Sequence, residues 1–301
     1  MRICLVGGLG TLGADIVDAY HFTHQLLILD DGLESCLSVN QVPPNVRVIN
    51  ANAARKDSYI SAIKSFQPEL VIYLATTVSD NQWRAFESLQ GLANFCEIGS
   101  TMSNFSIMYI QSFLTRDVSE PVTAKSRVTA RESYGVWKMA SEYLLQSYPG
   151  KKTSVILSNV VSPRISVGAI PAFTKRILAG ENITVTDTCR DYLSPKDFIA
   201  FLDAALELQN WPRECVVGSS KAISTKMLLD FVATALNIQS DSLEISVIAP
   251  KVTDPKSVVF DISETEKIFN WTPKDDLLQA ITKSVNSVRS SVQAVRQHHE
   301  G

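Results

Sequence analysis

The stretch that decides the fold is the N-terminal MRICLVGGLGTLGADIVDAYHFTHQLLILDD, residues 1–31. Its apolar runs at 3–6 and 26–29 are typical of buried strands, and the pattern between them, Thr11–Tyr20, is typical of a helix. The first strand is followed at once by Gly7-Gly8-Leu9-Gly10-Thr11-Leu12-Gly13. Such glycines permit a tight turn, and the helix N-terminus offers N–H groups to an anion. The stretch therefore predicts a β-α-β unit that binds a pyrophosphate, the alternative being a glycine turn without a ligand.

Asp30 closes this unit, 17 residues after Gly13. A carboxylate at the end of the second strand accepts hydrogen bonds from an adenosine ribose and repels a 2′-phosphate. Asp30 therefore favours NAD over NADP as the cofactor.

Short runs rich in Val, Ile and Leu continue to alternate with helical patterns through the first half of the chain. These runs do not alternate polar with apolar residues, as expected of strands that are covered on both faces. The expected strands are 46–49, 70–74, 107–110 and 153–157, and the expected helices are 58–65, 83–96 and 134–147. Repeated β-α-β units predict an α/β fold with a doubly wound parallel sheet of the Rossmann type.

The pattern changes after about Pro163, where helical segments begin to dominate. The expected helices are 170–179, 195–208, Thr225–Ala235 and 277–288, with small strands at 183–185, 216–217 and 243–248. We therefore expect a cofactor-binding domain at 1–163, a smaller α/β C-terminal lobe that binds the substrate at 164–289, and a frayed polar tail at 290–301.

A second motif is Tyr134-Gly135-Val136-Trp137-Lys138. Positions i and i+4 of a helix share a face, so the phenol and the ammonium can point into one cleft. A neighbouring cation favours the phenolate, so we expect Lys138 to lower the pKa of Tyr134 and make it a usable base. The alternative is an ordinary exposed helix face.

Ser112 is the third candidate, 22 residues before Tyr134 and just beyond the expected strand 107–110. Ligands of a doubly wound sheet bind outside the carboxyl ends of its strands, so Ser112 lies at the functional edge. The alternative is a serine that only caps a turn.

Composition excludes several classes of function. Lys and Arg number 28 against 31 Asp and Glu, and the net charge of −3 gives no basis for binding nucleic acid or an anionic membrane. Glycines and Asp15 interrupt the N-terminal apolar run, so we expect no export signal and no membrane span. The five cysteines are scattered and only four histidines occur, so we expect reduced thiols in a cytoplasmic protein and no metal site.

Taken together, the motifs resemble the extended short-chain dehydrogenase/reductase superfamily, in its NAD-dependent epimerase/dehydratase branch of sugar-nucleotide enzymes. The resemblance extends from Ile3 to about Val288. It is carried, in family order, by the glycine segment, Asp30, residues 71–75 (VIYLA), Ser112, the Tyr134 and Lys138 motif with Glu142, 158–164 (SNVVSPR), 167–171 (VGAIP), 190–197 (RDYLSPKD), 250–254 (PKVTD) and 271–273 (WTP).

The resemblance implies NAD as the cofactor and a nucleotide-diphosphate sugar as the substrate. It implies that Tyr134 removes a proton from a sugar hydroxyl held by Ser112, while Lys138 binds the nicotinamide ribose. Arg190 suits a diphosphate because its guanidinium binds in a bidentate manner, the alternative being an ion pair with Asp191 or Asp187. The catalytic residues implied are Ser112, Tyr134 and Lys138. The cofactor-binding residues implied are Gly7, Gly10, Thr11, Leu12, Gly13, Asp30, Asp31, Asn52, Ala53, Leu74, Ala75, Thr76, Tyr134 and Lys138. The substrate-binding residues implied are Ser112, Asn159, Arg190, Lys251 and Asp254.

The chain also departs from the family pattern. The departures are Asn52 for Asp, Tyr73 for His, Ser88 for Asn, Val161-Ser162 for Tyr-Gly, Lys251 for Arg, and Phe113-Leu114 after Ser112. Relatives that eliminate water from the sugar carry an Asp-Glu pair after this serine, and Phe113 and Leu114 cannot replace those acids. We therefore expect an epimerase that transfers a hydride transiently to tightly bound NAD. The alternatives are a ketoreductase of a keto-deoxy-sugar nucleotide, which consumes NAD(P)H, and a non-catalytic NAD-binding scaffold.

The expected helices 83–96 and 134–147 carry apolar residues around more of their circumference than one stripe facing the sheet requires. Family members often pair such helices across a twofold axis. We therefore expect an isologous homodimer built on these two helices. The alternative is that both faces are buried within one subunit.

Overall fold

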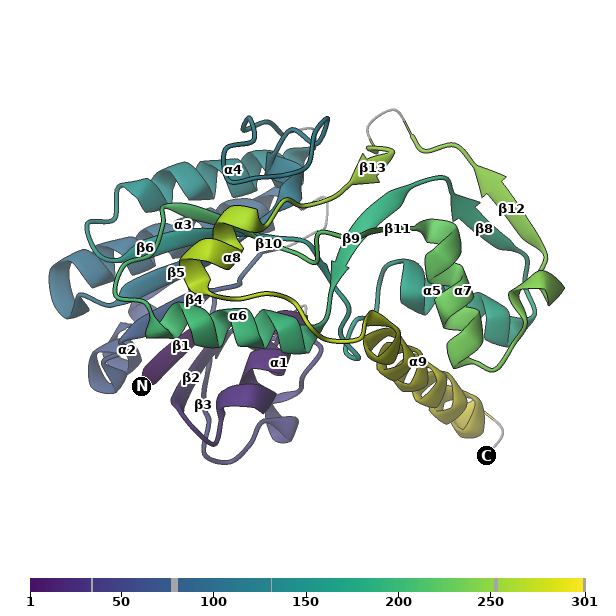
Figure 1. The fold of residues 1–301 in the computed structure, drawn as a ribbon. Coiled ribbons are helices and arrows are strands. Elements are labelled where there is room, and N and C mark those ends of the chain that lie inside the picture. Colours follow the sequence, from purple (N-terminus) through teal and green to yellow (C-terminus); the bar gives the residue numbers. More distant parts are fainter. Residues whose placement is uncertain (34, 77–80, 131, 252–253, 300–301) are drawn as a thin grey trace.

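The computed structural model describes residues 1–33, 35–76, 81–130, 132–251 and 254–299, which form a larger and a smaller lobe (Figure 1). The larger lobe contains a seven-stranded sheet in the order β10-β6-β5-β4-β1-β2-β3, and all neighbouring strands are parallel. Its strands are β1 (Arg2–Val6), β2 (Gln25–Asp30), β3 (Arg47–Asn50), β4 (Leu70–Tyr73), β5 (Ser106–Ser112), β6 (Lys152–Leu157) and β10 (Glu214–Val217).

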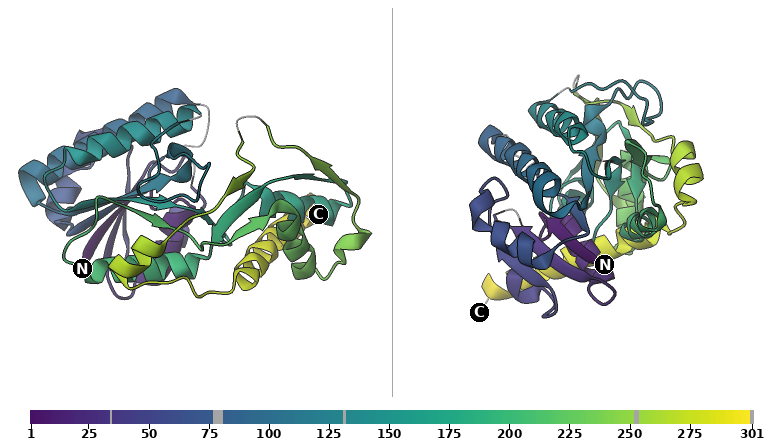
Figure 2. Two further views of the ribbon diagram at one scale, coloured as in Figure 1. Left: turned by 45° about the horizontal axis from the view of Figure 1, so that its top comes forward. Right: turned by 90° about the vertical axis from the view of Figure 1, so that its left-hand side faces the viewer.

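Helices cover both faces of this sheet, so the expected doubly wound fold is confirmed (Figure 2). Successive side chains of a strand enter opposite cores: Ile3 and Leu5 pack toward one face, and Cys4 and Val6 toward the other. The first face is covered by α1 (Thr11–Tyr20), α6 (Pro195–Glu207) and α8 (Ser263–Phe269), the second by α2 (Ile60–Phe66), α3 (Gln82–Ile98) and α4 (Ser133–Gln146).

The smaller lobe has its own core, formed where three helices pack together. These are α5 (Ala169–Ala179), α7 (Thr225–Ala235) and α9 (Leu277–His299). Beside them, β8 (Ile183–Thr186) pairs in parallel with β12 (Ile245–Ile248). A second small sheet, absent from the expectations, consists of β11 (Ala222–Ser224), β9 (Cys189–Leu193) and β13 (Ser257–Val258), with β7 (Asn159–Val160) also paired to β9. Single turns of tighter or wider helix occur at Val39–Gln41, Lys56–Ser58, Gly99–Ser103, Phe113–Thr115 and Ser240–Ser242.

Two segments that were expected in the smaller lobe belong to the larger one. Strand β10 pairs with β6 at the edge of the large sheet, and α6 packs against α1. The expectation for 195–208 and 216–217 was therefore wrong, because a short buried strand has the same apolar pattern in either sheet. The chain returns to the first lobe after it has begun the second, so a boundary at 163 and 164 does not separate these elements.

The segment that was expected to be a frayed polar tail is helical over the residues that the structure describes. Helix α9 continues to His299, while residues 300 and 301 lie outside the described residues. Gln, Arg and Ala are good helix formers despite the polar composition of this segment. Within the described ranges, no helix combines the length and the apolar character that a membrane crossing requires.

Candidate active site

The glycine segment forms the turn between β1 and α1, where close contacts require its glycines. Gly7 has a φ of +83°, and a Cβ there would lie 2.7 Å from the backbone nitrogen of Ala75. A Cβ on Gly13 would lie 2.5 Å from the Cα of Gly8, so α1 packs directly on the turn. Gly10 caps α1 without a side-chain hydrogen bond, which leaves the first N–H groups of the helix to meet an anion. This cradle fits a pyrophosphate.

Asp30 ends β2 beside this turn. Its Oδ2 accepts a hydrogen bond from the N–H of Leu9 at 2.9 Å, and its Oδ1 accepts one from the N–H of Gly32 at 2.9 Å and one from Ser35 Oγ at 3.1 Å. These contacts fix the carboxylate next to the glycine turn, the position that recognition of an adenosine ribose requires.

We expect NAD to bind more tightly than NADP by at least about tenfold, because a 2′-phosphate would meet the fixed Asp30 carboxylate in a partly dry site. Asp30→Asn should narrow this difference, since the amide carries no charge. Calorimetric titration of both proteins with both cofactors measures the effect. Tighter binding of NADP to the unaltered protein would contradict the assignment.

A cavity of about 1250 Å³ joins the glycine turn to the smaller lobe. At its far end it is lined by Asn159, Arg190 and Asp254. Within the part of the chain that the structure describes, Ser112, Tyr134, Lys138 and Lys251 are not among its lining residues, and no three potential metal ligands come together. The expected cofactor residues that line it are Gly7, Gly10, Thr11, Leu12, Gly13, Asp30, Asp31, Asn52, Ala53, Leu74, Ala75 and Thr76.

Ser112 is the last residue of β5 rather than a residue beyond it, and the short helical turn Phe113–Thr115 follows. Its Oγ accepts a hydrogen bond from the N–H of Leu114 at 3.2 Å, so the serine also caps this turn. A Cβ on Gly135 would lie 2.9 Å from the carbonyl oxygen of Leu114. The turn after Ser112 therefore packs closely on the first turn of α4, next to Tyr134.

Tyr134 and Lys138 are brought together on α4, as their spacing predicted. The Nζ of Lys138 lies 5.9 Å from the centre of the Tyr134 ring and 4.7 Å from that of Tyr109, and it donates a hydrogen bond to the carbonyl of Ile110 at 2.7 Å. Burial raises the pKa of Tyr134 to about 12, although a hydrogen bond with Thr76 acts in the opposite direction. Burial lowers the pKa of Lys138 to about 7.

The expected lowering of the Tyr134 pKa by Lys138 is therefore wrong for the protein alone. Burial raises the pKa of Tyr134 and also lowers that of Lys138, so the lysine offers the phenolate less positive charge than an exposed ammonium would. The sequence showed the helical spacing of the two groups but not the depth at which they are buried.

Lys138→Met should stabilise the protein at neutral and acidic pH. The pKa of this lysine is 10.5 in the unfolded chain but about 7 in the folded protein. Burying the charged form therefore lowers the free energy of unfolding, fully below pH 7 and less and less as the pH rises toward 10.5. After allowance for the lost hydrogen bond to Ile110, we expect a gain of roughly 3 to 5 kcal/mol at pH 6. Urea unfolding at pH 6, 8 and 10 tests this, and a variant less stable than the parent at pH 6 would contradict it.

Arg84 is a cavity residue that the sequence analysis missed. It lies on the first turn of α3, and its Nη1 and Nη2 lie 2.6 Å and 3.3 Å from the two carboxylate oxygens of Asp31. Both residues line the cavity. Asp31, which was expected to face the cofactor, is thus one half of a bidentate ion pair between the end of β2 and α3. The two residues are 53 positions apart, and apart from their opposite charges nothing in the sequence indicates that they pair.

Two departures from the family pattern prove to be in contact. The Tyr73 hydroxyl donates to the carbonyl of Ser88 at 2.7 Å, and Ser88 Oγ donates to the carbonyl of Ala75 at 2.6 Å. A Cβ on Gly91 would lie 2.4 Å from the Tyr73 hydroxyl. The three contacts tie α3 to the end of β4, where Ala75 lines the cavity.

Two of the expected substrate residues are paired at the far end of the cavity. Arg190 on β9 forms an ion pair with Asp254 through Nη2. Asn159 lies beside them, and its Nδ2 donates to a carbonyl of β9 at 3.3 Å. Lys251 is exposed, and residues 252 and 253 of the PKVTD segment lie outside the described residues. The structure thus groups three of the residues expected to bind a nucleotide diphosphate.

The alternative ion pairs of Arg190 do not form. Asp187 is paired with Lys256, with 3.2 Å between Oδ2 and Nζ. Asp191 is buried and accepts hydrogen bonds from the backbone N–H of Ser219 at 2.7 Å and from its hydroxyl at 2.9 Å. Arg190 is therefore held at the cavity by Asp254 and not on the surface by a sequence neighbour.

A sequence model of the NAD dependent epimerase/dehydratase family matches residues 3–218. The chain belongs to this family, in agreement with its doubly wound sheet, its glycine turn and its Asp30 carboxylate.

Solved structures agree with this assignment. The chain is similar to the Bordetella bronchiseptica enzyme WbmG in complex with NAD and UDP, at 28% identity over 97% of this chain and 96% of that chain, with a TM-score of 0.88. Two more distant structures share the fold. One is the Thermus thermophilus UDP-glucose 4-epimerase complex with NAD, at 23% identity, 96% and 99% coverage and a TM-score of 0.83. The other is the Bacillus anthracis dTDP-glucose 4,6-dehydratase in complex with NAD, at 14% identity, 96% and 97% coverage and a TM-score of 0.82.

Proposed function

We propose that this protein is an NAD-dependent sugar-nucleotide epimerase that acts through transient hydride transfer to tightly bound NAD. The observation that carries the proposal is the cavity lined at one end by the glycine turn and Asp30 and at the other by Arg190 and Asp254. The end with the glycine turn and Asp30 suits a dinucleotide, and the end with Arg190 suits the diphosphate of a second ligand. The likeness to WbmG, whose complex contains NAD and UDP, supports a UDP-sugar as the first substrate to test.

The chain's own residues explain how NAD would be held. The glycine turn and the first turn of α1 would bind its pyrophosphate, and Asp30 would bind the ribose of its adenosine half. When bound, NAD supplies a hydride acceptor and, in its oxidised form, a positive charge. Lys138 would bind the nicotinamide ribose, as the family resemblance implies.

Tyr134 would act as base and acid in turn. It would take the proton from a sugar hydroxyl as that carbon becomes a ketone. After the keto-sugar has rotated in the site, the hydride would return to its opposite face and Tyr134 would return the proton to the oxygen. Because burial raises the pKa of Tyr134 to about 12, the phenolate needs additional positive charge beside it. We therefore expect proton removal to depend on the oxidised cofactor, and Ser112 to hold the reacting hydroxyl.

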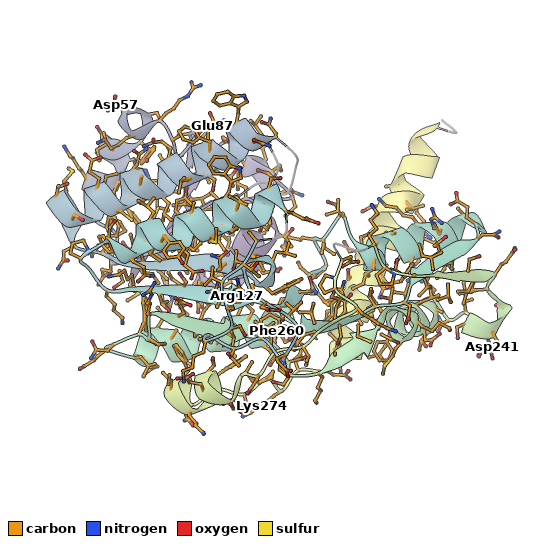
Figure 3. All side chains as sticks on the ribbon, turned by 90° about the horizontal axis from the view of Figure 1, so that it is seen from above. Asp57, Glu87, Arg127, Asp241, Phe260 and Lys274 are labelled. Atoms are coloured by element: carbon orange, nitrogen blue, oxygen red, sulfur yellow. The ribbon has the colours of Figure 1, made fainter. Side chains whose placement is uncertain are left out.

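The residue after Ser112 bears on the choice between epimerase and dehydratase. Phe113 packs edge-on against Phe260, which lies near the middle of the molecule, with 6.4 Å between the ring centres (Figure 3). Elimination of water needs one group that donates a proton to the leaving hydroxyl and another that removes the proton beside it. A phenylalanine in a fixed aromatic contact can do neither, which supports epimerisation.

The proposal is tested by the cofactor content and by turnover without added cofactor. An epimerase regenerates its NAD in every cycle, so the purified protein should carry NAD that absorbance and mass spectrometry detect after denaturation. Incubation with UDP-, GDP-, CDP- and dTDP-sugars should convert one of them into its epimer, as followed by NMR. Stoichiometric consumption of added NADH or NADPH would instead show a ketoreductase, and bound NAD without conversion of any sugar would support a scaffold.

The surface of α3 and α4 supports assembly into a homodimer. The two helices lie side by side on the outer side of the large sheet, away from the smaller lobe (Figure 2). Trp83 and Phe86 on α3 and Val136 and Tyr143 on α4 are exposed, Trp83 by 80% and Tyr143 by 60%. These side chains are not buried within one subunit, so a twofold pairing of the helices would cover them.

We expect light scattering on dilute protein to give a mass near twice the 33.1 kDa of one chain. Tyr143→Asp should shift the mass toward one chain, because it places a charge in the helix pairing. Phe22→Asp is the matched control, since Phe22 is 86% exposed but lies outside α3 and α4. A parent protein with the mass of a single chain would rule the dimer out.

A further inference from the structure

Gln111 contacts the backbone of two candidate catalytic residues at once. It precedes Ser112 on β5 and is 3% exposed. Its Oε1 accepts a hydrogen bond from the N–H of Ser112 at 2.9 Å. Its Nε2 donates to the carbonyl of Lys138 at 2.9 Å and to Oε2 of Glu142 at 2.8 Å. One buried amide thus joins the strand that carries Ser112 to the helical turn that carries Lys138.

The other side of Glu142 is held by Arg116. The Nη2 of this fully buried arginine lies 2.8 Å from Oε1 of Glu142 and 2.8 Å from Oε2 of Glu214 on β10. Residues 111 and 116 flank Ser112 on both sides, so the segment around the serine is tied to α4 at two points. The Glu142 carboxylate is the common partner, and it is fixed from both directions.

The amide at position 111 is chemically suited to these contacts. It donates twice and accepts once, as the Lys138 carbonyl, Glu142 and the Ser112 N–H require. A hydrocarbon side chain would leave these buried groups without a partner, at the cost of their desolvation. A carboxylate would place a second negative charge against Glu142.

We propose that Gln111 is a positioning residue that sets Ser112 relative to Lys138 and, one helical turn earlier, to Tyr134. The inference rests on the proposed function, in which Ser112 holds the hydroxyl from which Tyr134 takes a proton. Because such a transfer requires the groups to be placed within a fraction of an ångström, a small shift of Ser112 lowers the rate of the chemical step without weakening ground-state binding. Gln111 acts through its neighbours and not on the substrate.

Gln111→Met tests the role, because it keeps the side-chain volume but removes all three hydrogen bonds. We expect kcat for the sugar nucleotide to fall about 10- to 100-fold while KM and the content of bound NAD stay within about twofold of the parent. Thr265→Val is the matched control, since it removes a buried hydrogen bond of 2.7 Å to the carbonyl of Val216 on the far side of the sheet and should leave kcat unchanged. An unchanged kcat in Gln111→Met, or a loss of bound NAD in parallel with kcat, would overturn the positioning role.

A pH profile separates positioning from general support of the fold. In Gln111→Glu, the introduced carboxyl should have a raised pKa because it is buried beside Glu142. When protonated it can still donate one hydrogen bond, and when ionised it repels Glu142. The ratio of its kcat to that of the parent should therefore fall as the pH rises through this pKa. A constant ratio from pH 5 to 9 would contradict the proposal.

Hydrogen exchange provides a readout that does not depend on turnover. The Ser112 N–H loses its partner in Gln111→Met, so its exchange should become at least about tenfold faster, whereas Thr265→Val should leave it unchanged. If the parent protein converts no sugar nucleotide, the proposed function fails. The exchange result still decides whether Gln111 anchors Ser112, and equal exchange in the parent and Gln111→Met would refute that anchoring.

Discussion

Tyr134→Phe is expected to lower kcat on the true sugar nucleotide by about a thousandfold to ten-thousandfold, with the fold and the bound NAD retained. The variant removes only the hydroxyl that takes and returns the proton, and it keeps the ring beside Lys138. The hydrogen bond with Thr76 is also lost, but one such bond contributes only about 1 kcal/mol to stability. Steady-state rates, together with the NAD content of the purified variant, measure the effect.

Tyr20→Phe is the control for this experiment. The Tyr20 hydroxyl donates to Asp203 at 2.8 Å between α1 and α6, so the same atom is removed from a partly buried contact remote from α4. This variant should keep its rate. A near-parental rate in Tyr134→Phe would show that another group is the base, and the proposed mechanism would have to be abandoned.

Arg116→Met is expected to lower the free energy of unfolding by about 3 to 5 kcal/mol, because it leaves the buried Glu142 carboxylate without its cation and leaves the partly buried Glu214 carboxylate with only the exposed Arg213. Burial and the charge of Glu142 already raise the pKa of Glu214. Without the arginine the pKa of Glu214 should rise further, so the loss is full near neutral pH and shrinks on acidification. Urea unfolding at pH 5 and pH 8 measures both effects.

The matched control is Arg2→Met, because Arg2 pairs with Glu69 on the surface at 3.9 Å and both side chains are more than two-fifths exposed. Exposed pairs contribute about 0 to 1 kcal/mol, so this variant should be almost as stable as the parent. Equal losses in the two variants would show that the buried ion cluster does not stabilise the fold. Converting both carboxylates to amides in the Arg116→Met background should recover part of the loss.

The first elements of the chain could be predicted because each is decided locally. The strand, glycine turn and helix at 3–20 need only neighbouring residues to specify them, and the structure has them within one residue. Strand β10 was placed in the wrong lobe because its apolar pattern specifies burial but not the partner strand. Strand β9 was missed because its sequence CRDYL is polar where Arg190 lines the cavity and Asp191 accepts hydrogen bonds.

The residues of the candidate site also fall into those that a local motif reveals and those that only the fold brings together. Glycine-turn residues and Asp30 could be found because a motif with fixed spacing builds the cradle. The pairs of Gln111 with Glu142 and of Asp31 with Arg84 join residues 31 and 53 positions apart, and only the fold brings them together. The pKa of Tyr134 was predicted in the wrong direction because desolvation depends on packing, which no helical spacing reveals.

The return of the chain to the large sheet has a consequence for synthesis on the ribosome. Strand β10 lies more than fifty residues after β6, its partner, and the elements β7, α5, β8, β9 and α6 come between them. Until residue 217 has emerged, β6 is an uncovered edge with unpaired backbone groups, the kind of edge on which chains aggregate. A fragment that stops at Pro163 keeps this edge permanently, so the lobes cannot be produced apart by cutting there. The first lobe begins the chain but completes its fold only after much of the second has been made.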